Sequence, residues 1–199
     1  MISRNYVWYA GYGSNLNKQR FYCYIEGGTP TFGKRASDGC TDKTLPADEQ
    51  DIILPYELYF ALPFNAHGTS NWGDGGVAFL SDTLTESSAT RCRLWKITEE
   101  QYEEVWGQES KSWYGKPIKL GKIDDCPVWT ITHEMPVTRI VRPSVPYLKT
   151  IIVGLKETFQ MNDREIAEYL VEKRGVEGYY SLEEMAEIAS AVSDSGRGE

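Results

Sequence analysis

A glycine-rich turn near the start of the chain holds the first residues that can do chemistry. Its sequence is Tyr9-Ala10-Gly11-Tyr12-Gly13-Ser14-Asn15-Leu16. Gly11 and Gly13 let the backbone approach a ligand closely. A turn that leads into a helix leaves backbone N–H groups that can bind a carboxylate, a phosphate or a developing oxyanion. A tight strand-to-helix turn without a ligand is the alternative interpretation.

Glu109 is the second candidate, because it stands between two tryptophans in the sequence, Trp106 and Trp113. Bulky aromatic side chains exclude water from a neighbouring carboxylate, and a partly dehydrated carboxylate suits general-base catalysis. The alternative is an ordinary solvated glutamate, since the chain contains 29 Asp and Glu residues.

A proline-flanked segment is the third candidate, and it reads Arg142-Pro143-Ser144-Val145-Pro146-Tyr147-Leu148. The prolines fix the entry of a helix, and Tyr147 falls in its first turn. There its hydroxyl can point into a cleft, although a packed tyrosine is the alternative. The two histidines, His67 and His133, have no partner pattern, and the four cysteines show no C-x-x-C spacing.

Together these segments resemble the gamma-glutamylcyclotransferase-like family over roughly residues 6–160. The matching blocks are Tyr12–Leu16, Trp72-x-x-Gly75-Gly76-Val77-Ala78, Glu109, Pro143-Ser144-x-x-Tyr147 and Ile151-Ile152-x-Gly154-x-Lys156-Glu157. The resemblance implies an α+β fold, a small mixed β-barrel flanked by helices. It also implies that a γ-glutamyl amide or amine cyclises to 5-oxoproline and releases its amine. The substrate's own α-amine attacks its γ-carbonyl, so the protein supplies a base and hydrogen-bond donors.

The resemblance also implies a role for each matching residue. Glu109 is the general base, and the turn residues Tyr12, Gly13, Ser14, Asn15 and Leu16 bind the glutamyl group through backbone N–H groups. Tyr147 matches a tyrosine that contacts substrate through its hydroxyl, and Tyr114 lies near an aromatic position of the family. We expect no metal site, because no ligand set is visible, and no cofactor.

Two departures from the family pattern keep other functions open. Ser110 stands where the family commonly has glycine, and Val105-Trp106-Gly107-Gln108 replaces the usual Asp-containing lead-in to the glutamate. The alternative is a non-catalytic binding module of the same fold, for a carboxylate-bearing metabolite or a protein partner. A nucleotide or phosphate binder is a third reading, but the turn lacks the lysine of the phosphate-binding loop G-x-x-x-x-G-K-[ST].

Strands dominate the first two thirds of the chain and helices the last third. Strands are predicted at 6–12, 57–62, 76–80, 91–97, 118–123, 128–132 and 138–141, and helices at about 16–25, after the capping box at Thr98, and after Pro143, Asn162 and Ser181. This order predicts an α+β domain over 1–160. A C-terminal helical appendage over 161–199 packs on the same domain, with a frayed tail from about 193. Residues 27–51 are predicted as a long loop, a substrate lid or a tolerated insertion.

The composition excludes several partners. The 199 residues carry 21 Lys and Arg against 29 Asp and Glu, a net charge of −8, which disfavours nucleic acid and anionic membranes. No apolar run is long enough to span a bilayer, and the N-terminus lacks a signal-peptide pattern. We therefore expect a cytoplasmic protein with a small γ-glutamyl substrate; the oligomeric state stays open.

Overall fold

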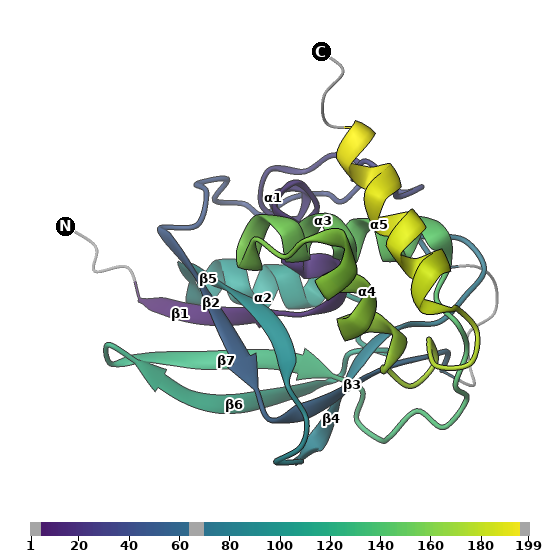
Figure 1. Cartoon of the computed structure of the whole chain (residues 1–199). Coiled ribbons are helices and arrows are strands. Elements are labelled where there is room, and N and C mark those ends of the chain that lie inside the picture. Colours follow the sequence, from purple (N-terminus) through teal and green to yellow (C-terminus); the bar gives the residue numbers. More distant parts are fainter. Residues whose placement is uncertain (1–4, 64–69, 196–199) are drawn as a thin grey trace.

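The computed structural model describes residues 5–63 and 70–195. Its elements are β1 (Tyr6–Gly11), η1 (Gly13–Leu16), α1 (Lys18–Glu26), β2 (Asp48–Leu54), β3 (Tyr56–Ala61), β4 (Val77–Leu84), β5 (Thr90–Thr98), α2 (Glu99–Gln108), β6 (Lys116–Ile123), β7 (Cys126–Thr132), α3 (Val145–Phe159), α4 (Asp163–Val171) and α5 (Leu182–Ser195). Figure 1 shows how these helices and strands are arranged, with the β6–β7 hairpin on the opposite side from α5. The α+β class predicted from the sequence is confirmed.

Strand β1 is the centre of the larger sheet. The order of its five strands is β2-β5-β1-β7-β6, with β1 antiparallel to β5 and parallel to β7. The sheet is therefore mixed, and β3 and β4 form a separate antiparallel pair. The side chain of Thr132 in β7 bonds the backbone of Leu80 in β4, which joins the two sheets. Because β1 is paired on both sides, the turn at its end is held firmly.

The two faces of β1 belong to two hydrophobic clusters. Trp8 and Ala10 enter the larger cluster with α3, α4 and α5, whereas Val7 and Tyr9 enter the smaller one with α1 and α2. This alternation follows from the two-residue period of a strand. Both faces of the sheet centre are thus covered by helices, and η1 emerges between the two layers.

Side-chain caps fix the helix starts near the candidate site. Thr98 and Gln101 form the predicted capping box of α2, and the Ser144 hydroxyl accepts the Tyr147 N–H at the start of α3. Helix α2 continues to Gln108. Glu109 is the C-cap residue, with extended backbone and its N–H bonded to the Val105 carbonyl at 3.1 Å. Its side chain therefore projects from a fixed helix end.

Two strand predictions were wrong. The predicted loop over 27–51 contains the start of β2, an edge strand paired with β5 whose first four residues are exposed and polar. Polar composition is typical of an exposed edge and concealed the strand. Residues 138–141 form no strand, because only the single bridge of Ile140 to Ala61 connects them to β3.

The C-terminal helices contribute to the larger cluster. Ile166, Leu170, Met185 and Ala189 of α4 and α5 are fully buried there with α3. Helix α5 continues to Ser195, past the predicted start of a frayed tail, and residues 196–199 lie outside the described part of the chain. No helix of the described residues has the length and apolarity that crossing a bilayer requires.

Candidate active site

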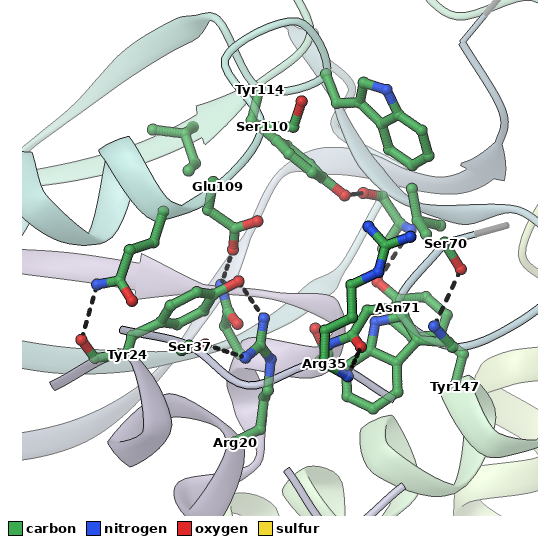
Figure 2. A pocket seen from close by; sticks show the side chains of 18 of the residues that line it. Arg20, Tyr24, Arg35, Ser37, Ser70, Asn71, Glu109, Ser110, Tyr114 and Tyr147 are labelled. Atoms are coloured by element: carbon green, nitrogen blue, oxygen red, sulfur yellow. Dashed lines mark hydrogen bonds between the residues drawn. The ribbon is translucent and has the colours of Figure 1, made fainter. Parts of the chain in front are cut away.

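A cavity of about 620 Å³ opens where η1, α1, the end of α2 and the start of α3 meet (Figure 2). Six of the residues predicted from the sequence line it: Tyr12, Ser14, Asn15, Glu109, Tyr114 and Tyr147. They come from four separate stretches of the chain, and the fold brings them together. The predicted loop also contributes, since residues 35–38 form part of the wall.

Asn15 holds the Glu109 carboxylate in one orientation. Its amide nitrogen Nδ2 donates to Glu109 Oε1 at 2.9 Å and to the Tyr9 hydroxyl at 3.0 Å. Its backbone carbonyl accepts the indole N–H of Trp95 at 3.0 Å. The amide oxygen of Asn15 is buried and has no hydrogen-bond partner among the described residues. The half-buried Glu109 carboxylate is thus held at the cavity wall by a buried amide.

The residues around Glu109 fix the end of α2. The Gln108 amide donates to the Tyr24 carbonyl at 2.9 Å and accepts the Gly39 N–H at 3.2 Å, which ties α2 to α1 and to the loop. The Ser110 carbonyl accepts the N–H groups of Trp113 and Tyr114 at 2.7 and 2.8 Å. The residues at both departures from the family pattern therefore have structural contacts, and the turn at Ser110 directs two aromatic residues to the cavity.

Only one of the two flanking tryptophans faces the carboxylate's cavity. Trp113 lines it, whereas the Trp106 indole packs beside Tyr102 and donates to the Tyr114 carbonyl at 2.7 Å. The expectation that both rings shield Glu109 was wrong, because α2 turns Trp106 toward the smaller hydrophobic cluster.

Gly13 and Leu16 support the turn and do not line the cavity. Gly13 has φ +61°, and a Cβ on it would lie 2.7 Å from the Ala78 Cβ and 3.0 Å from the Tyr147 hydroxyl. Leu16 is buried against α3, where a Cβ on Gly154 would lie 2.4 Å from the Leu16 Cβ. Glycine at 13 and 154 thus allows η1 to sit between β4 and α3. Ligand binding by the backbone N–H groups of 12–16 stays a prediction.

Three tyrosine hydroxyls are fixed by backbone groups around the cavity. Tyr147 accepts the Ala78 N–H at 3.1 Å, Tyr114 donates to the Ala78 carbonyl at 2.9 Å, and Tyr12 donates to the Ile131 carbonyl at 2.7 Å. Burial raises the pKa of Tyr147 to about 12 and raises those of Tyr12 and Tyr114 well above the ordinary value. All three therefore stay neutral, and Tyr147 keeps a proton that it can donate.

The sequence analysis missed Arg20, Tyr24, Ser37 and Asn71, which also line the cavity. Arg20 and Tyr24 are four residues apart on α1, so helical spacing places them on one face. That spacing was the available signal. Nothing in the sequence indicates that Ser37 and Asn71 join them, because they come from the loop and from the turn before β4. Asn71 holds that loop in place through its side-chain oxygen, which accepts the Lys34 and Arg35 N–H groups.

The donor set for a metal ion is absent from the residues that the structure describes, where no three His, Cys, Asp or Glu side chains are grouped to share one. All four cysteines are free thiols, three of them buried. His133 bonds the Met135 backbone, and His67 lies outside the described residues.

No family model matches the chain. A curated relative, histone deacetylase 5 from Arabidopsis thaliana, is 30% identical over 202 residues, covering 82% of this chain and 30% of that protein. The chain thus spans less than a third of that relative's length.

Two solved structures match nearly the whole chain. An uncharacterized protein loc79017 from Homo sapiens superposes with a TM-score of 0.57 at 18% identity, covering 94% of this chain and 99% of that one. A structure described as gamma-glutamyl cyclotransferase superposes with a TM-score of 0.54 at 20% identity, covering 96% and 99%. The chain therefore has the gamma-glutamylcyclotransferase-like fold that its motifs predict.

Proposed function

We propose that the chain is a γ-glutamyl cyclotransferase that converts a small γ-glutamyl amide or amine into 5-oxoproline and a free amine. One observation carries the proposal: Asn15 orients the Glu109 carboxylate into a cavity beside the glycine-rich turn. The fold likeness to a gamma-glutamyl cyclotransferase supports the reaction class.

Glu109 acts as the base because it accepts protons from the substrate's α-ammonium. The Asn15 amide that orients the Glu109 carboxylate at the cavity supports this placement. Once one proton has moved to Glu109, the free amine attacks the substrate's own γ-carbonyl carbon. The nucleophile and the carbonyl belong to one molecule, so ring closure needs no external nucleophile.

The cyclisation consumes no water and no reducing agent. A carbon–nitrogen bond forms in the five-membered ring, and the bond to the leaving nitrogen breaks. The lactam nitrogen retains one of the three ammonium protons, and the other two finish on the leaving nitrogen. Glu109 thus ends in the state in which it began. We propose that Tyr147 donates a hydrogen bond to the substrate's γ-carbonyl oxygen, which gains negative charge during the attack, because its hydroxyl stays neutral.

A product assay tests the proposal. Purified protein is incubated with γ-glutamyl amino acids, γ-glutamyl amines and glutathione in ¹⁸O-labelled water, and the products are identified by mass spectrometry. Cyclisation predicts unlabelled 5-oxoproline and amine in equal amounts. Release of ¹⁸O-labelled glutamate would identify a hydrolase instead. Binding of panel members without any release would support the non-catalytic binding module.

A further inference from the structure

Arg20 is a buried cation on the wall of the candidate site. It lies in the first turn of α1, and its side chain faces the cavity with only 6% of the residue exposed. The guanidinium carbon lies 3.9 Å from the centre of the Tyr24 ring and 5.6 Å from that of Trp72. Two aromatic rings thus hold the guanidinium plane in place, and Figure 2 shows it directed toward Tyr24 and Ser37.

The hydrogen bonds of Arg20 go to neutral groups. Nη1 donates to the Ser37 hydroxyl at 3.1 Å, and Nη2 donates to the Tyr24 hydroxyl. Nε is buried without a partner, and no carboxylate of the described residues lies within 4 Å of the guanidinium. A buried charge without a counter-ion is unfavourable, so this arrangement suits a cation that receives its anion from a ligand.

The position of Arg20 relative to Glu109 indicates which anion. The Tyr24 hydroxyl lies between the two charged groups, as Figure 2 shows. Burial raises the pKa of Tyr24, the Glu109 charge raises it further and Arg20 lowers it, so both charges act on that one hydroxyl. Glu109 can accept protons from an ammonium on one side of this hydroxyl, and Arg20 can bind a carboxylate on the other. This pair matches an α-amino acid, whose ammonium and carboxylate share one carbon atom.

We propose that Arg20 binds the α-carboxylate of the γ-glutamyl group and so selects substrates in which this carboxylate is free. The identity of the ligand rests on the proposed function, whereas the preference for a carboxylate rests on Arg20 alone. The planar guanidinium can donate through its two Nη groups to both carboxylate oxygens. Arg35 also lines the cavity, but it is exposed and solvent screens its charge.

The test compares two ligands that differ only in this charge, 5-oxoproline and its neutral carboxamide. Neither has a leaving group, so calorimetry measures binding without turnover. The ratio of the two dissociation constants within one protein does not depend on the fraction of folded molecules. We expect the wild type to prefer the acid by about 10- to 100-fold, because hydrogen bonds to charged groups are strong.

The variants assign that preference. Arg20→Gln should bind both ligands within about threefold of each other, since no buried charge remains. Arg20→Lys should keep part of the preference, because the charge remains without the planar fork. Arg164→Gln, at an exposed position of α4 outside the cavity lining, is the control and should keep the wild-type ratio.

Three outcomes would overturn the assignment: a wild type that binds neither ligand, a wild type that binds both equally, or Arg20→Gln that keeps the wild-type ratio. If 5-oxoproline release is observed alongside any of these, the proposed function stands without it. An Arg20-dependent preference without release from any γ-glutamyl compound would leave a carboxylate site and contradict the cyclotransferase.

Discussion

Two buried arginines lie close to the turn Gly13–Leu16, and they differ in what neutralises them. Arg93 bonds the carboxylates of Glu157 and Glu49 at 3.0 Å each and the Leu16 carbonyl at 3.2 Å. Arg20 is equally buried, but among the described residues its hydrogen bonds go to two hydroxyls, those of Ser37 and Tyr24. The protein supplies the counter-ions of one arginine, whereas the other faces the cavity.

We call the part of the turn that contacts Arg93 the structural side and the part that faces the cavity the cavity side. On the structural side, Arg93 connects β5, β2 and α3 around Leu16, and its guanidinium also lies 4.4 Å from the Trp95 ring centre. On the cavity side, the groups are oriented but not fully hydrogen-bonded: Arg20 Nε and the Asn15 amide oxygen are both buried and find no partner in the part of the chain that the structure describes. Changes on the two sides should therefore have different consequences.

The largest expected effect on stability is that of Arg93→Met. Loss of this arginine leaves the buried Leu16 carbonyl without this donor and removes the guanidinium from two carboxylates that, among the described residues, keep only their bonds to Lys18. We expect the free energy of unfolding to fall by about 2–4 kcal/mol. The loss should lie toward the lower end of this range, because the side chains of Glu49 and Glu157 are more than a third exposed and solvent screens their ion pairs. Arg20→Met should lower it by less than about 1 kcal/mol, since no counter-ion loses its partner. Urea unfolding of both variants measures this contrast, and equal losses would contradict it.

Tyr147→Phe tests the cavity side with a smaller change. The variant leaves the buried Ala78 N–H without its acceptor, so we expect it to stay folded with about 1–2 kcal/mol less stability. The rate of 5-oxoproline release or the substrate affinity should fall by at least about tenfold, because a fixed donor is lost. Steady-state kinetics and circular dichroism on the same preparation distinguish the two effects. Wild-type kinetics would remove Tyr147 from the site.

The smallest effect is a pH dependence on the structural side. Burial alone would raise the pKa of Glu49, but Arg93 and Lys18 outweigh burial and hold it below the ordinary value. The stabilisation from ionised Glu49 is therefore present above the unfolded pKa of about 4.3 and lost as pH falls through the folded pKa. Thermal unfolding from about pH 6 to about pH 3 should show the wild type losing its advantage over Glu49→Gln below about pH 4. A constant advantage throughout would show that Arg93 does not act through this carboxylate.

Local sequence signals predicted much of the fold. The caps at Thr98, Ser144 and Asn162 start helices because a short polar side chain satisfies exposed N–H groups wherever it occurs. The turn at Asp124-Asp125 between β6 and β7 is also local, because aspartate tolerates the positive φ that both residues adopt. The edge strand β2 was missed because its exposed residues carry no hydrophobic alternation.

The candidate site was predictable only where a motif marks it. Tyr12, Asn15, Glu109 and Tyr147 were found because their motifs resemble a family, and the fold gathers their side chains around one cavity. Arg20 was missed because its candidate role depends on its surroundings in the folded protein, where no carboxylate of the described residues pairs with it. Burial, the absence of a counter-ion and the proximity of Glu109 exist only after α1 and α2 have packed together.

The most direct test of the account compares two glutamates on α2. Glu109→Gln keeps the size of the side chain and one oxygen that can accept from Asn15, but it removes the base. Glu103→Gln neutralises an exposed glutamate within α2. Release of 5-oxoproline from the best substrate of the panel is measured for both variants and the wild type. We expect Glu109→Gln to lose about 10²–10⁴-fold in rate and Glu103→Gln to match the wild type. Equal rates in all three proteins would contradict the assignment of Glu109 as the base.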